Sequence, residues 1–214
     1  LELSLLVAHS RNTALEYVRA QDFDLVICDL EVPSTDGGLD HSISHGDMVR
    51  VEIAERYPGI PIIVHSGKGT MSYVTKLMKE IDKDDYFGRG VGDPLLDYVE
   101  KVNLPDLVTA VRRHAENLEA LKNIEVLSDL TDPLDVRAIA IYARRRGGSQ
   151  VKVLPLAGGL STARICHLVV YDAQGATKAN VVARIDSLES VQAETARYAE
   201  HVSPLIARGG FPHL

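Results

Sequence analysis

Residues 24–30 read DLVICDL, a short run rich in apolar side chains. Two further runs of this kind follow along the chain, IPIIVHS at 60–66 and LLDYVEK at 95–101. Such near-continuous apolar runs are typical of strands that are buried on both faces of a parallel sheet. We also expect the apolar run LSLLVA at 3–8 to form a strand ahead of these three.

Stretches with one apolar face separate the apolar runs and predict helices at 12–20, 48–57, 72–81 and 105–122. Alternating strands and helices indicate βα units around a parallel sheet. The sequence therefore predicts an α/β fold, with a doubly wound parallel sheet, over a first domain at 1–118.

Beyond Asn123 the pattern changes. A helix is expected at 132–146, and the β-like runs VKVLPL, ARICHLVVYD and ANVVARID lead into another helix at 188–202. Strands joined by hairpin-like links predict a smaller α+β domain with an antiparallel sheet. We expect a helical connector at 119–149 and the second domain at 150–214.

The bulk composition narrows the class of protein. The chain has 214 residues and a formal charge of −7, which argues against a nucleic-acid partner. We find no apolar run of about 18 residues and no secretory signal, so we expect a cytoplasmic protein without membrane partners. The chain does not begin with Met, and we expect a fragment cut at both ends. Cys28 and Cys166 lie within apolar runs and are expected to be buried thiols.

The ends of the three apolar runs carry the chemistry. Asp29 is the last residue but one of the first run, and Ser66 and Lys101 are the last residues of the other two. Functional groups gather at the carboxyl ends of strands in an open parallel sheet. A carboxylate is a nucleophile toward a phosphoryl group, a hydroxyl donates a hydrogen bond to it, and an ammonium offsets its charge. Taken alone, an aspartate at the end of a buried strand is more often a helix cap or a loop anchor than a catalytic residue.

The segments VAHSRNTALEYVRAQDFDLVICDLEVP, PIIVHSG and DYVEKVNLPDLVTAVRRH resemble a response-regulator receiver domain, which has a flavodoxin-like fold. The resemblance implies that Asp29 accepts the phosphoryl group, that Ser66 and Lys101 contact it, and that Tyr98 is the aromatic switch. It also implies Mg²⁺ held by Asp29 and the backbone carbonyl of Glu31. A histidine kinase or phosphotransfer protein is the expected donor, and an output protein the expected partner.

Three features depart from the receiver pattern. The family's first strand, with its acidic pair for Mg²⁺, is missing from this sequence, and we expect it upstream. Val102 follows Lys101 in place of the usual proline. The loops at 34–46 and 82–93 are long, which predicts partner-binding surfaces or disorder. Within the first loop, Asp40, His41 and His45 are the residue types of a metal site, but the sequence does not fix their geometry.

The second domain resembles the N-terminal lobe of the aminoglycoside and choline phosphotransferase type of kinase. The resemblance implies that Gly158, Gly159 and Ser161 form the glycine loop. Arg184 stands where that family has the lysine that contacts phosphate, and Glu194 would form an ion pair with it. The glycines also suit an ordinary hairpin, and the two charges an ordinary ion pair. ATP is expected only in a full-length kinase-like domain, because the catalytic lobe is missing from this sequence.

Three functions remain open at this stage. In the first, the chain is a two-component signalling module in which phosphorylation of Asp29 regulates the kinase-like domain. Alternatively, it is a degenerate receiver that acts as a protein-interaction module, or the regulatory part of a phosphotransferase. Whether the chain has enzyme activity beyond accepting phosphate is left open by the sequence.

Overall fold

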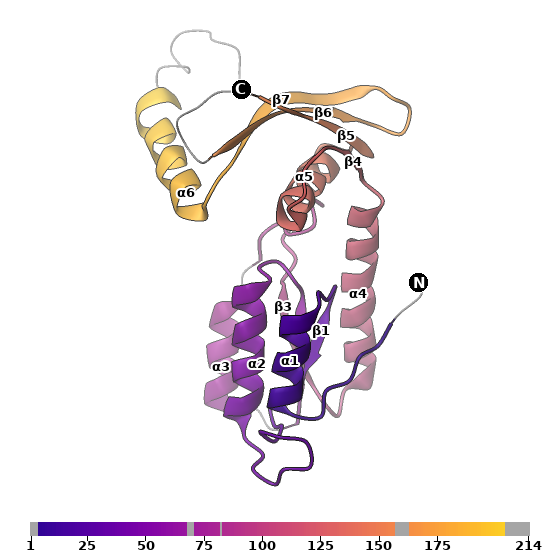
Figure 1. The fold of residues 1–214 in the computed structure, drawn as a ribbon, viewed down its shortest axis with the longest axis vertical. Coiled ribbons are helices and arrows are strands. Elements are labelled where there is room, and N and C mark those ends of the chain that lie inside the picture. The colour runs from indigo at the N-terminus through magenta and orange to yellow at the C-terminus, as the bar shows by residue number, and fades with distance from the viewer. Residues whose placement is uncertain (1–3, 68–70, 82, 157–162, 204–214) are drawn as a thin grey trace. The chain divides into compact units, whose positions relative to one another are not determined.

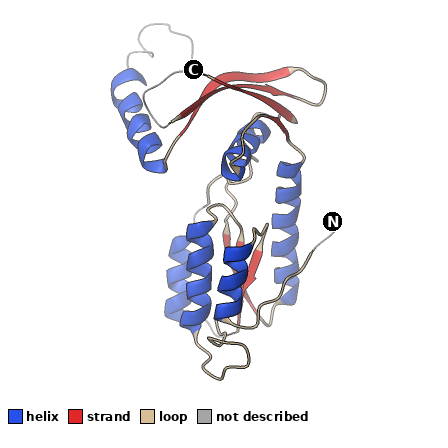
Figure 2. Cartoon of the chain, in the orientation of Figure 1, coloured by secondary structure: helices blue, strands red, loops and turns tan. Residues whose placement is uncertain are grey.

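The computed structural model describes residues 4–67, 71–81, 83–156 and 163–203, shown as a ribbon in Figure 1. The chain divides into two compact units, Leu1–Ala120 and Leu121–Leu214. Each unit has its own sheet (Figure 2), so each is described separately.

The first unit alternates helices and strands, as the apolar runs predicted. Its elements are α1 (Arg11–Ala20), β1 (Val26–Cys28), α2 (Ile43–Arg56), β2 (Ile62–Ser66), α3 (Met71–Glu80), β3 (Leu96–Glu100) and α4 (Leu104–Lys122). The three strands are parallel in the order β1-β2-β3. The predicted α/β class with a parallel sheet is confirmed.

Helices cover both faces of this sheet because successive side chains of a strand point to opposite faces. On one face, Ile62 of β2 packs with Val18 of α1 and with Ile53 of α2. Leu77 of α3 joins the same face through Val64. On the other face, Ile63 and Val99 pack against Ala110 of α4.

The strand expected at 3–8 is not formed, since the described residues 4–8 have no strand pairing. Leu5 is 82% exposed, and the neighbouring Leu6 and Val7 are also exposed. Among the described strands, β1 pairs with β2 alone, so the sheet ends at β1 and residues 4–8 do not extend it. The apolar pattern predicts a strand, but only pairing with a neighbour forms one, and this segment is not paired.

The loop at 82–93 is ordered over the part that the structure describes. Phe87 is fully buried, with its ring centroid 5.9 Å from that of His114 on α4. Asp85 accepts hydrogen bonds from the backbone N–H groups of Arg89 and Gly90, and Asp93 N–H donates to the carbonyl of Asp84. One aromatic anchor and aspartate-capped turns therefore hold the loop to the body of the unit.

The second unit has a four-stranded sheet in the order β4-β5-β6-β7. Its elements are β4 (Glu125–Leu127), α5 (Pro133–Arg145), β5 (Gln150–Pro155), β6 (Arg164–Tyr171), β7 (Thr177–Ile185), α6 (Leu188–Arg197) and a π-helical turn, η1 (Tyr198–Val202). The three predicted strands β5, β6 and β7 pair antiparallel, as expected. The sequence analysis did not predict β4, whose parallel pairing with β5 makes the whole sheet mixed.

The segment expected as a helical connector, 119–149, contains β4 and α5 in addition to the end of α4. Ile139 and Ala143 of α5 pack with Val151 and Leu168 in the core of the second sheet. The segment therefore supplies one strand and one covering helix of this unit. The three residues of β4 were too few to give an alternating pattern in the sequence.

Both cysteines are buried free thiols, as predicted. Burial is the main cause that raises the pKa of Cys28 to about 12, so this thiol stays protonated at neutral pH. Within the described ranges, no helix is both long and apolar enough to cross a membrane.

A buried polar cluster ties β3 to α4. Asp97 lies on the face of β3 that α4 covers, where it forms an ion pair with Arg113 and a 2.6 Å contact with His114 Nε2. Burial alone would raise the pKa of Asp97, but the hydrogen bonds from His114 and Arg113 outweigh it and hold the pKa below its ordinary value near 3.8. Asp97 therefore stabilises the fold in its charged form.

The substitution Asp97→Asn tests this cluster. The pKa of Asp97 is lower in the folded state than in the unfolded state. Its contribution to the free energy of unfolding is therefore complete above the unfolded-state pKa, and it is lost as pH falls through the folded-state pKa. We predict that the variant is less stable by about 1–3 kcal/mol at neutral pH, since donors of Arg113 and His114 lose a charged acceptor.

The same variant should lose less stability than the parent between about pH 5 and about pH 3. Urea unfolding at each pH measures the free energy. Asp22→Asn, at an exposed position, is the matched control and should follow the parent. Equal acid sensitivity of Asp97→Asn and the parent would contradict the assignment.

Candidate functional site

The parallel sheet brings the three predicted strand-end residues to one edge. Asp29 follows β1, Ser66 is the last residue of β2, and Lys101 follows β3. The register places Ser66 opposite Glu100, one residue before Lys101. The expected gathering of functional groups at the carboxyl ends of the strands is therefore present.

An ion pair joins the outer two of these residues. Lys101 Nζ lies 2.5 Å from Asp29 Oδ2, and Glu31 N–H donates a hydrogen bond of 3.3 Å to Asp29 Oδ1. The side chains of Asp29 and Lys101 are 27% and 49% exposed. An accessible pair of this kind adds only about 0–1 kcal/mol to stability, so its arrangement is easily exchanged for contact with a ligand.

Ser66 and Tyr98 lie beneath this pair. Ser66 is fully buried, and its carbonyl accepts hydrogen bonds from Lys101 N–H at 3.4 Å and from the hydroxyl of Tyr98 at 3.5 Å. The Tyr98 ring packs inward beside Leu30 and Val64. The Tyr98 hydroxyl is therefore tied to the backbone next to the site, and a change at Ser66 would reach this ring directly.

Gly46 is a site residue that the sequence analysis missed. It lies within α2, and its N–H donates to the carbonyl of Leu30. A Cβ at this position would lie 2.3 Å from the Asp29 carbonyl oxygen and 2.4 Å from Leu30 Cα. Glycine therefore lets α2 lie directly on the backbone that carries Asp29. The sequence held no signal for this role, because Gly46 was predicted to lie in a loop, whereas the structure begins α2 at Ile43.

The oxygen atoms near Asp29 are of the kind that Mg²⁺ binds. They are the Asp29 carboxylate and the backbone carbonyl of Glu31, which also lies 3.4 Å from His41 Nδ1. Asp40 instead accepts a hydrogen bond from Ser34 N–H, and no group of three potential His, Cys, Asp or Glu ligands gathers among the described residues.

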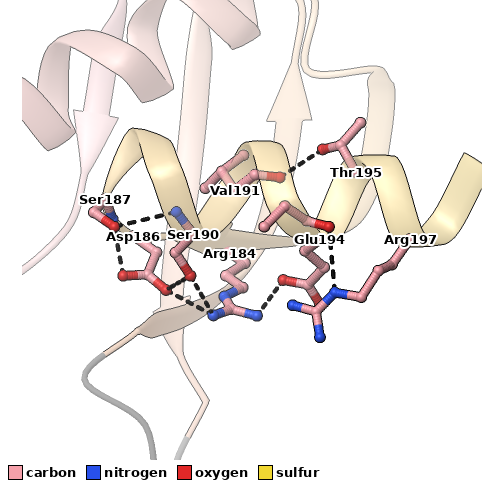
Figure 3. A network of polar contacts seen from close by, with 9 residues as sticks. Arg184, Asp186, Ser187, Ser190, Val191, Glu194, Thr195 and Arg197 are labelled. Carbon is pink, nitrogen blue, oxygen red and sulfur yellow. Dashed lines mark hydrogen bonds and ion pairs between the residues drawn. The ribbon is translucent and has the colours of Figure 1, made fainter.

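In the second unit, Arg184 and Glu194 do lie together, at the centre of the network in Figure 3. Arg184 Nη2 also contacts Asp186 at 2.6 Å and Ser190 Oγ at 3.1 Å. Hydrogen bonds from Ser190 and then from Arg184 lower the pKa of Asp186 to about 2. The guanidinium therefore faces two carboxylates and would have to exchange one of them to contact a phosphate.

Asp186 and Ser190 were not recognised from the sequence, although they flank the start of α6, where Ser187 is the N-cap. The glycine-loop residues Gly158, Gly159 and Ser161 fall outside the described residues. The nucleotide contacts expected of that loop therefore stay a prediction.

The contact between α2 and the Asp29 backbone is tested by Gly46→Ala. Alanine normally favours a helix over glycine by about 1 kcal/mol. Here we predict the opposite sign, a loss of about 1–3 kcal/mol, because the added methyl group overlaps the Asp29 and Leu30 backbone.

The free energy of unfolding is measured by urea denaturation. The matched control is Gly67→Ala at the same edge of the sheet, where the added Cβ would lie 3.7 Å from Lys101 Cδ, an ordinary contact. The control should change stability by less than about 0.5 kcal/mol. A stabilised Gly46→Ala variant would show that α2 does not rest on this backbone.

Comparison of the chain with protein-family models, with curated proteins and with solved structures gives no match. A function for the chain therefore rests on its own residues. Among the described residues, the group Asp29, Ser66 and Lys101 offers the most defined chemistry.

Proposed function

We propose that the first unit is a receiver-type phosphoacceptor of two-component signalling, with a flavodoxin-like arrangement and Asp29 as the acceptor. The observation that carries the proposal is the accessible Asp29 carboxylate at the end of β1, with Lys101 Nζ at 2.5 Å. Folds of this kind bind ligands at the carboxyl ends of the strands of a parallel sheet. Here the helices cover the two faces of the sheet and not this edge.

The chemistry assigns each residue a role. A carboxylate oxygen of Asp29 attacks the phosphorus of the donor, the bond from phosphorus to the donor breaks, and an acyl phosphate remains on Asp29. Lys101 moves from the carboxylate to the new phosphoryl oxygens and offsets their charge. Mg²⁺, held by Asp29 and the Glu31 carbonyl, would supply further charge neutralisation when bound.

Phosphorylation is proposed to act through contacts that differ between the two states. Lys101 leaves a carboxylate for a phosphoryl group, and its backbone N–H is bonded to the Ser66 carbonyl that also holds Tyr98. Movement of Lys101 would therefore be felt at Ser66 and Tyr98. A switch requires contacts of this kind, which differ between the phosphorylated and the unphosphorylated state. A histidine kinase or phosphotransfer protein is the proposed donor, in a cytoplasmic setting.

We propose that the second unit is the output, part of a kinase-like domain that an output partner or a catalytic lobe completes. The supporting observation is the ion pair between Arg184 on β7 and Glu194 on α6. Because Asp186 shares the same guanidinium, this pair is proposed to hold α6 against the sheet until a phosphate replaces one carboxylate.

The test is a titration of the protein with beryllofluoride and Mg²⁺, followed by NMR because the 214 residues contain no Trp for a fluorescence signal. We expect saturable shifts at Asp29, Ser66 and Tyr98, since the phosphoryl mimic binds the acceptor carboxylate. Asp29→Ala should abolish these shifts, whereas Asp22→Ala, an exposed control, should retain them.

Absence of shifts in a folded protein would reject the phosphoacceptor. The first unit would then be a degenerate receiver whose fold serves binding alone. Shifts that persist in Asp29→Ala would place the acceptor at another residue.

A further inference from the structure

A cavity of about 370 Å³ lies in the first unit, away from Asp29. Its lining includes Ile62 and Leu96, the first residues of β2 and β3, whereas the candidate phosphoacceptor site lies where the strands end. Its volume falls within the range of about 300–1,000 Å³ that small-molecule sites occupy. The cavity is therefore a second candidate site, and its chemistry differs from that of the first.

Most of the cavity wall is apolar. Ile62 and Leu96 line it together with Tyr57 and Tyr86. Two small residues help to keep it open, Ala54 on α2 and Gly59, whose φ of +96° is in the region that favours glycine. Such a wall suits a ligand with a flat or branched apolar body.

One ion pair forms the polar corner of the cavity. Arg50 of α2 is only 5% exposed. Its Nε and Nη2 lie 2.8 Å from Asp47 Oδ1, and its Nη1 lies 2.9 Å from Glu80 Oε2. Arg50 and Glu80 line the cavity and also join α2 to α3.

The two carboxylates that hold Arg50 are not equivalent. Asp47 is 21% exposed and also accepts a hydrogen bond from the hydroxyl of Tyr73 at 2.7 Å. Burial alone would raise the pKa of Asp47, but the hydrogen bonds from Tyr73 and Arg50 lower it below its ordinary value. Asp47 is therefore a fixed, charged partner of Arg50.

Glu80 is the exchangeable partner. Its side chain is 37% exposed, and it is the last residue of α3, where the partial negative charge of the helix end disfavours a carboxylate. Water is available to Glu80 if it leaves, whereas the buried Arg50 needs a negative partner at all times. A ligand that brings its own carboxylate would satisfy Arg50 in place of Glu80.

We propose that this cavity binds a small carboxylate with an aromatic or branched apolar body, whose carboxylate replaces Glu80 on Arg50 Nη1. The body lies against Tyr57, Tyr86 and the two strand starts. Binding removes the contact from Arg50 to Glu80, one of the contacts that join α2 to α3, while Tyr73 and Lys76 of α3 stay bound to Asp47 of α2. The proposal does not depend on phosphorylation of Asp29, and it holds whether or not that proposed function is correct.

Phenylacetate is the probe, titrated into the full-length protein and followed by NMR at Tyr57 and Tyr86. We expect saturable shifts there and none at Asp29. Glu80→Gln should bind phenylacetate about fivefold more tightly, because the competing carboxylate is gone. The control Glu55→Gln changes an exposed glutamate of α2 that does not line the cavity, and it should bind as the parent does.

Two further arms separate the proposal from nonspecific apolar binding. Phenylacetamide has the same ring without the charge, so it should bind more weakly and should not respond to Glu80→Gln. Ala54→Phe fills the cavity and should abolish binding while Arg50 and Glu80 remain in place. The proposal would be overturned if phenylacetate saturated neither the parent nor Glu80→Gln. Equal affinities of the parent for phenylacetate and phenylacetamide would also overturn it.

Discussion

The parallel pairing of β1, β2 and β3 is the constraint on which the first unit depends. It places three strand ends at one edge, so residues far apart in the sequence, Asp29 and Lys101, come within 2.5 Å of each other. The same pairing buries both sheet faces and therefore requires helices on each. The site is thus a consequence of the fold, and no single segment of the chain contains it.

The sequence predicted those features that depend on local patterns. The apolar runs at β1, β2 and β3 gave the strands, and their last residues gave the site. Prediction from the sequence failed where a segment forms a strand only if a neighbouring strand, distant in sequence, pairs with it. Residues 4–8 are apolar but have no strand beside them in the described structure, and β4 forms only because β5 lies next to it.

The same limit applies to side chains. Gly46 has no chemistry of its own, and its importance lies in the Asp29 backbone that it touches. Phe87 lies in a loop whose length predicted either a partner-binding surface or disorder, and its buried ring packs beside His114 of α4. Contacts between elements that are distant in sequence leave no periodicity for sequence analysis to detect.

Ion pairs in this protein have two kinds of role. The pair of Asp97 with Arg113 is largely buried and joins β3 to α4, and the pair of Arg50 with Asp47 is largely buried within α2. Both side chains of the pair of Lys101 with Asp29 reach water, whereas in the pair of Arg50 with Glu80 only Glu80 does. Both of our proposals place ligand binding at a pair in which at least one partner reaches water and can be exchanged.

The most direct test of the central claim is chemical identification of the acceptor. The full-length protein is incubated with acetyl phosphate and Mg²⁺ and then treated with borohydride, which reduces an acyl phosphate to an alcohol. Peptide mass spectrometry then locates the reduced side chain. The account predicts reduction at Asp29, dependent on Mg²⁺. Reduction at another acidic residue, or at none in a folded protein, would contradict it.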